Sequence, residues 1–188
     1  DSRSFFGLSD KKFTILVVGG SLGAEPINSG VHKHINTLID NNCQVLWQTG
    51  SLQYEHYNNL KLKNCYIHNF IERMDLAYSA ADIVISRAGA IAITEISFLK
   101  KASILIPSPH VTDNHQYKNA QYLAQNNACI LINEADFINT QISKIINRMK
   151  DAEYRNTIGS NAYKLFKYNA AHNIAEIIIN QMSKKNAK

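Results

Sequence analysis

Residues 13–24 read FTILVVGGSLGA, an apolar run rich in β-branched residues that leads directly into a glycine-rich turn. Such a run is typical of a strand buried on both faces of a parallel sheet. The same order of apolar run, turn and amphipathic stretch recurs several times further along the chain. This alternation predicts βαβ units and therefore an α/β fold, a Rossmann-like parallel sheet with helices on both faces.

The pattern also predicts where the elements lie. We expect strands at Phe13–Val18, Gln44–Gln48, Asn64–His68, Asp82–Ser86, Ser103–Ile106 and Cys129–Ile132. Helices should begin near Leu22, Arg73, Gly89, Asn114 and Ala135, and further helices are expected at Asp151–Phe166 and Ala170–Met182. The chain then divides into a linker-like start at 1–12, a domain at 13–166, and a C-terminal helix and polar tail at 167–188. Apolar residues at helical spacing along the last helix indicate a packing surface.

The composition excludes several classes of protein. Of the 188 residues, 45% are apolar and 19% charged, so the chain can bury a substantial core and is not disordered. Twenty Lys and Arg against fifteen Asp and Glu give a net charge of +5, which favours anionic partners. The basic residues are scattered without interleaved aromatics, so nucleic acid is not an expected partner. No apolar stretch approaches the roughly 18 residues that span a bilayer.

The three cysteines favour reduced thiols in a cytosolic protein. Cys43, Cys65 and Cys129 are odd in number, far apart and without a C-x-x-C spacing, so neither a disulfide scaffold nor a zinc site is expected. We expect no metal and no cofactor. The chain opens with Asp1 and its first residues lack the features of a signal peptide, which suggests a fragment of a longer protein.

The first glycine turn is a candidate phosphate site, because a helix start exposes unpaired N–H groups and glycines let an anion approach the backbone. Glycines at 19, 20 and 23 do not match G-x-G-x-x-G, and the strand ending at Trp47–Gly50 carries no carboxylate for a ribose. Both departures argue against NAD. No G-K-[ST] follows, which excludes a Walker A loop. A tight turn without a ligand remains the alternative.

A second turn lies between the strand DIVIS at 82–86 and the sequence RAGAIAITE at 87–95. Small residues at 88–90 and 92 leave this helix start open to a bulky anion. Glu95 lies about one turn deeper, where its carboxylate can accept two hydrogen bonds from a vicinal diol. This arrangement suits a nucleoside diphosphate with its ribose at Glu95. In the alternative interpretation, Glu95 is solvated or pairs with Lys100 or Lys101.

A third loop, at 107–114, again leads from a strand into a helix. Asp113 or Asn114 can cap this helix, which places His115, Gln116 and Asn119 in its first turns. Side-chain amides there can read sugar hydroxyls, because Gln and Asn both donate and accept hydrogen bonds. The alternative for His115 is an ordinary surface histidine, and nothing in the sequence marks it as a general base.

The order and spacing of these three loops, together with NFIERM at 69–74, resemble the donor-binding half of a family of bacterial peptidoglycan glycosyltransferases. Members of that family transfer N-acetylglucosamine from UDP-N-acetylglucosamine to lipid I and so form lipid II. The resemblance covers nearly the whole chain from Phe13 onward. It implies one half of a double-Rossmann (GT-B) enzyme, with residues 13–166 as the UDP-sugar-binding domain. By this resemblance the full-length protein would be an inverting hexosyltransferase that acts in cell wall biogenesis. It would thereby contribute to cell shape and cell division.

The resemblance also implies residue roles. Ser21 would contact the diphosphate, Phe70 would cap the uracil, and the backbone of Ile71 would read its edge. His115 and Gln116 would contact the sugar. The segment that would cradle the phosphates at its start and hold the ribose through Glu95 comprises Ala90, Ile91, Ala92, Ile93, Thr94 and Glu95. Relatives can carry Thr or Ser in place of Ala92 and Gln in place of His115, so those two contacts differ here.

By the same resemblance, this chain lacks the N-terminal half, which carries the acceptor site, the membrane-docking patch and the general base. No catalytic residue is therefore expected in this chain, which should bind donor without turnover. Lipid I and the inner face of the cytoplasmic membrane would be partners through the missing half. Two alternatives remain: the soluble donor-binding subunit of a two-subunit glycosyltransferase, or a non-catalytic nucleotide-binding module.

Overall fold

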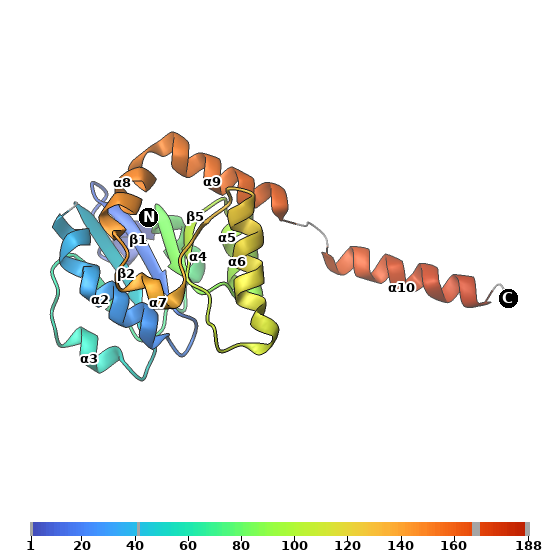
Figure 1. Cartoon of the computed structure of the whole chain (residues 1–188), viewed down its shortest axis with the longest axis horizontal. Helices are drawn as coiled ribbons and strands as arrows, with labels where there is room; N and C mark the ends of the chain where they lie inside the picture. Colours follow the sequence, from blue (N-terminus) through green and yellow to red (C-terminus); the bar gives the residue numbers. More distant parts are fainter. Residues whose placement is uncertain (1, 41, 167–169, 187–188) are drawn as a thin grey trace.

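A parallel sheet runs through the middle of the domain (Figure 1). It has six strands in the order β3-β2-β1-β4-β5-β6, and every neighbouring pair is parallel. The computed structural model describes residues 2–40, 42–166 and 170–186. The strands are β1 (Phe13–Val18), β2 (Cys43–Gln48), β3 (Cys65–His68), β4 (Ile83–Ser86), β5 (Ala102–Leu105) and β6 (Ile130–Leu131). All six predicted strands are confirmed within two residues.

Helices connect the strands and cover both faces of the sheet. They are α1 (Ser2–Phe5), α2 (Glu25–Asp40), α3 (Tyr54–Asn58), α4 (Met74–Ala80), α5 (Ala90–Phe98), the 3-10 turn η1 (Thr112–Asn114), α6 (His115–Gln125), α7 (Glu134–Phe137), α8 (Ile142–Lys150), α9 (Ala152–Leu165) and α10 (Ala170–Asn186). The helix expected to start near Leu22 begins later, at Glu25, because the glycine turn is longer than predicted. The helix expected from Ala135 is two helices, α7 and α8.

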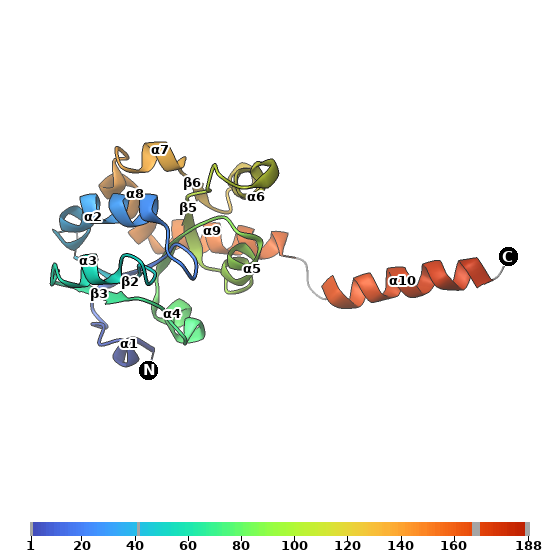
Figure 2. The same cartoon turned by 90° about the horizontal axis from the view of Figure 1, so that it is seen from below.

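The core consists of two clusters, one on each face of the sheet, because successive side chains of a strand point to opposite faces. In β1, Ile15 and Val17 belong to the cluster under α2 and α8, whereas Leu16 belongs to the cluster under α4, α5 and α6. Figure 2 shows α2 and α4 on opposite sides of the sheet. Helices on both faces are therefore confirmed, as is the α/β fold.

The first twelve residues, expected to be linker-like, pack against the domain. Phe6 and Leu8 are buried in the same cluster as Tyr78 of α4. Arg3 donates to the carbonyl oxygen of Ala80 at 3.2 Å and forms an ion pair of 2.9 Å with Asp82, next to the start of β4. The start of the chain is thus fastened to α4 and β4.

The last helix, α10, points away from the sheet (Figure 1). Its apolar side chains are more than half exposed: Ile174 58%, Ile177 60%, Ile178 53%, Ile179 61% and Met182 61%. The predicted packing surface is therefore open in this chain. No helix in the described ranges combines the length and the apolar character needed to cross a bilayer.

Candidate functional site

The predicted site residues all lie at the carboxyl edge of the sheet. Ser21 follows β1, Phe70 and Ile71 follow β3, the segment from Ala90 to Glu95 lies in α5 after β4, and His115 and Gln116 begin α6 after β5. The strand order reverses between β1 and β4, so the glycine turn and the start of α5 flank a topological switch point. Open parallel sheets bind ligands in the crevice at such a point.

The glycine turn after β1 is pressed against the segment that follows β2. Gly23 has φ +80°, and a Cβ added there would lie 2.0 Å from the carbonyl oxygen of Thr49. From the other side, a Cβ at Gly50 would lie 2.1 Å from the carbonyl oxygen of Leu22. Only glycine permits this approach of two backbones, and it leaves Ser21 exposed at the tip of the turn.

Gln48, which we did not single out from the sequence, joins two predicted parts of the site. Its Nε2 donates to the carbonyl oxygen of Gly20 at 2.8 Å, and its Oε1 accepts from the N–H of Ile71 at 2.8 Å. The side chain is 2% exposed. The Ile71 N–H is therefore already paired inside the chain, which leaves the Ile71 carbonyl as the backbone group that could read a base. The signal for Gln48 in the sequence is a polar residue at the last position of an apolar strand.

The start of α5 is open. Its N-cap residue is Gly89, without a side-chain cap, and a Cβ placed at Gly89 would meet nothing within 4 Å. The N–H groups of the first turn, at Ala90, Ile91 and Ala92, therefore carry the positive end of the helix dipole toward unfilled space. Ile91 is 78% exposed at this end of the helix.

Glu95 accepts a hydrogen bond of 2.9 Å at its Oε2 from the hydroxyl of Tyr78, which lies on α4. Burial raises the pKa of the Tyr78 hydroxyl, and the neighbouring Glu95 charge raises it further. The alternative partners of Glu95 are engaged elsewhere. Lys100 lies over the ring of Tyr163, and Lys101 donates to the carbonyl oxygen of Ala81 at 2.7 Å.

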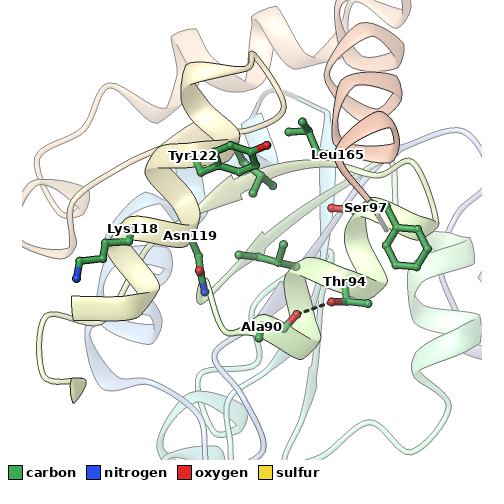
Figure 3. Close-up of a pocket in the computed structure, with 10 residues that line it drawn as sticks. Ala90, Thr94, Ser97, Lys118, Asn119, Tyr122 and Leu165 are labelled. Carbon is green, nitrogen blue, oxygen red and sulfur yellow. Dashed lines mark hydrogen bonds between the residues drawn. The ribbon is translucent and has the colours of Figure 1, made fainter. Parts of the chain in front are cut away.

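The other side of α5 faces α6 across a cavity of about 600 Å³ (Figure 3). Ile93, Thr94 and Ser97 line it from α5, and Asn119 and Tyr122 line it from α6. The Thr94 hydroxyl donates to the carbonyl oxygen of Ala90 at 2.8 Å (Figure 3). Thr94 and Glu95 therefore lie on different sides of the helix, and the structure does not bring them together.

Side chains in the first turns of α6 form hydrogen bonds with the loops beside it. Gln116 Oε1 accepts from the N–H of Ser108 at 3.0 Å, and Asn119 Nδ2 donates to the carbonyl oxygen of Ala88 at 3.3 Å. His115 is exposed, and its Nδ1 lies 2.9 Å from the carbonyl oxygen of Thr112. As predicted, Asn114 lies at the N-cap and His115 begins the helix, but Asn114 has a left-handed conformation and its side chain makes no cap hydrogen bond.

A partly buried ion pair, which the sequence did not reveal, lies beside the α5 start. Arg87, two residues before the N-cap, pairs with Glu134 at the beginning of α7, and each side chain is 14% exposed. Arg87 also donates to the carbonyl oxygen of Ile106 at 3.2 Å. The loops after β4, β5 and β6 are thereby tied together.

Burial raises the pKa of all three cysteine thiols. Cys43, Cys65 and Cys129 form no disulfide. Burial raises the pKa of the Cys65 and Cys129 thiols to about 12, so both stay protonated near neutral pH. Within residues 2–40, 42–166 and 170–186, no three His, Cys, Asp or Glu side chains are grouped as metal ligands would be.

Comparison with known proteins places these features in a family. Residues 14–174 match the family model "Glycosyltransferase family 28 C-terminal domain". A relative from Parabacteroides distasonis, named UDP-N-acetylglucosamine–N-acetylmuramyl-(pentapeptide) pyrophosphoryl-undecaprenol N-acetylglucosamine transferase, is 39% identical over 98% of this chain and 51% of its own length. A relative of the same name from Flavobacterium psychrophilum is 39% identical over 95% of this chain and 49% of its own length. The chain thus spans about half the length of these curated relatives.

Solved structures agree with the sequence relatives. The crystal structure of Acinetobacter baumannii MurG is 28% identical, with a TM-score of 0.80 over 95% of this chain and 53% of that chain. The solution structure of ALG13 matches with a TM-score of 0.55 over 74% of this chain and 87% of that chain. At 18% identity, the second likeness is one of fold alone.

Proposed function

The chain belongs to the glycosyltransferase family 28 C-terminal domain family, and from this premise we propose that it is the donor-binding half of an enzyme that transfers N-acetylglucosamine from UDP-N-acetylglucosamine to lipid I, forming lipid II. The observation that carries the proposal is the carboxylate of Glu95, anchored one turn inside an uncapped helix start at the switch point of the sheet. That pairing of an anion site with a diol acceptor fits a nucleoside diphosphate.

In the proposed complex the diphosphate lies at the α5 start, between Ala90 and the glycine turn carrying Ser21. Glu95 accepts hydrogen bonds from the two ribose hydroxyls, and Phe70, which is 51% exposed, stacks on the uracil. The start of the helix, at Ala90, Ile91 and Ala92, forms the phosphate cradle, whereas Ile93 and Thr94 line the cavity on the α6 side. Gln116 and His115 contact the hydroxyls of the sugar from the first turn of α6.

The chemistry we propose is an inverting displacement. An acceptor hydroxyl attacks the anomeric carbon from the face opposite UDP, the carbon–oxygen bond to the diphosphate breaks, and the hydroxyl proton passes to a base on the other half of the enzyme. The leaving UDP gains negative charge, which the unpaired N–H groups and dipole of α5 stabilise. This half thus supplies donor binding and leaving-group stabilisation.

The acceptor partners belong to the same proposal. The chain spans about half of relatives whose name includes an undecaprenol-linked muramyl-pentapeptide acceptor. We infer that an N-terminal half holds lipid I, and that the complete enzyme works at the inner face of the cytoplasmic membrane.

We expect UDP-N-acetylglucosamine at about 100 times its dissociation constant to stabilise the chain by about 2.7 kcal/mol. For a chain of this size, that corresponds to a rise in melting temperature of roughly 5 to 10 °C. Glu95→Ala should remove most of the shift because the ribose loses its acceptor. Thermal unfolding with UDP-N-acetylglucosamine, UDP-glucose, UDP and NADH measures both effects.

The control is Glu153→Ala, which removes an exposed helical glutamate on α9 and should leave the shift intact. A full shift in Glu95→Ala, or stabilisation by NADH but by none of the uridine nucleotides, would contradict the proposal. A larger shift with UDP-N-acetylglucosamine than with UDP-glucose would identify the sugar.

We expect Phe70→Ala to weaken UDP binding roughly 10-fold, because the uracil loses its stacking partner. The melting temperature without ligand should hardly change, since Phe70 is half exposed. Isothermal titration calorimetry measures the dissociation constant. Phe5→Ala is the matched control, because Phe5 is 59% exposed but lies on α1, and unchanged UDP affinity in Phe70→Ala would exclude base stacking there.

A further inference from the structure

Tyr78 is a core residue whose one polar atom reaches the proposed site. Its side chain is 4% exposed and packs in the cluster under α4, α5 and α6. Its hydroxyl donates to Glu95 Oε2 at 2.9 Å. The bond joins α4 to α5, two helices that follow different strands of the sheet.

Glu95, in contrast, is exposed on the surface of α5. An exposed glutamate ordinarily samples many rotamers, and fixing one of them for a ligand costs entropy at the moment of binding. The Tyr78 hydroxyl restricts that freedom before any ligand arrives. Among the described residues, no cation forms an ion pair with Glu95, so this hydrogen bond is the electrostatic contact that orients it.

We propose that Tyr78 is a positioning residue, which holds the Glu95 carboxylate in the orientation that accepts the 2′- and 3′-hydroxyls of a ribonucleotide. The inference rests on the proposed donor site. An ionised carboxylate has about four lone-pair positions, so it can accept from Tyr78 and from both hydroxyls of a vicinal diol together.

The Tyr78 hydroxyl is suited to this task because it remains a donor. Burial and the adjacent carboxylate both raise its pKa, so it keeps its proton throughout the physiological range. An ammonium group would neutralise the carboxylate and compete with the diol for it. A neutral phenol orients Glu95 while leaving its charge available to the ligand.

Tyr78→Phe tests the proposal because it keeps the buried ring and removes the hydroxyl alone. We expect the affinity for UDP, measured by calorimetry on the 188-residue chain, to fall about 3- to 10-fold. The preference for UDP over 2′-deoxy-UDP should shrink, because a mobile carboxylate discriminates less between one and two hydroxyls. In a Glu95→Ala background, Tyr78→Phe should have no further effect on UDP affinity.

Tyr66→Phe is the matched control: Tyr66 packs partly buried against the same cluster, and no side-chain hydrogen bond of its hydroxyl is found among the described residues. An unchanged UDP affinity in Tyr78→Phe, with UDP affinity weakened in Glu95→Ala, would overturn this inference and spare the proposed function. Equal losses for UDP and 2′-deoxy-UDP, or the same loss without Glu95, would show a merely structural role and overturn it too. Absence of UDP binding by the unmodified chain would overturn both.

Discussion

Gly23→Ala should lower the melting temperature by roughly 6 to 12 °C and remove stabilisation by UDP-N-acetylglucosamine. Alanine at φ +80° carries a left-handed strain of about 1–2 kcal/mol. Its Cβ would also stand 2.0 Å from the Thr49 carbonyl oxygen, which is backbone and cannot rotate away. Relief requires the two segments to separate, so the total cost should reach about 3 kcal/mol or more. Thermal unfolding with and without ligand measures both effects.

Gly89→Ala is the control for this substitution. Gly89 has φ −69°, which alanine adopts readily, and the added Cβ meets nothing within 4 Å. Its cost should be about 1 kcal/mol or less, as for other exchanges at an N-cap. A Gly23→Ala variant as stable as Gly89→Ala would mean that the turn and the segment after β2 do not touch in solution.

Asn28→Ala should destabilise the chain by about 3 kcal/mol, because three polar groups lose a partner. The buried Asn28 side chain accepts from Trp47 Nε1 at 3.0 Å and donates to the Thr49 carbonyl oxygen at 2.8 Å and to Gln53 Oε1 at 2.5 Å. Both the Trp47 indole and Thr49 are fully buried, so water cannot replace the lost bonds. Chemical denaturation with urea measures the change in unfolding free energy.

Asn139→Ala provides the comparison, since the Asn139 side chain accepts from Lys33 at 3.3 Å in an exposed position. Its removal should change stability by about 0.5 kcal/mol or less. Comparable losses of unfolding free energy in the two variants would mean that the buried hydrogen bonds of Asn28 contribute no more to stability than the exposed one of Asn139.

The fold could be predicted from the sequence because the patterns that indicate it are local. The run from Phe13 to Val18 and the glycines after it contain the apolar strand, the turn and the start of a crossover within a dozen residues. The boundary that differs from the prediction, near Leu22, lies in a turn that packs against the backbone of Thr49, which is distant in the sequence. Likewise, one helix beginning near Ala135 is predicted where the structure has α7 and α8, which are separated by residues 138–141.

The candidate site could be predicted from the sequence only in part. The sequence could place Ser21, Phe70, Glu95 and Gln116 at one edge, because the carboxyl ends of parallel strands meet there. Their roles remain predictions. The sequence does not reveal the partners that hold such residues in place. The hydrogen bond from Tyr78 to Glu95 and the two hydrogen bonds of Gln48 join positions that are distant in the chain and meet only in the folded protein.

Capping illustrates the same limit. Asp113 and Asn114 are typical cap residues by type, yet both adopt left-handed backbone conformations, with φ of 53° and 51°. Both residues lie in η1, at the junction where the loop after β5 enters α6. Residue preference alone does not determine their conformation.

The two hydrogen bonds of Gln48 have a consequence for redesign of the proposed donor site. One side-chain amide serves both the loop beside Phe70 and the turn beside Ser21. A change at Gln48 aimed at a different nucleobase would disturb the phosphate turn at the same time, so the two recognition tasks cannot be altered separately through that residue. An engineer who wants a new base preference should keep Gln48 and vary Phe70, the exposed side chain whose replacement leaves the shared amide untouched.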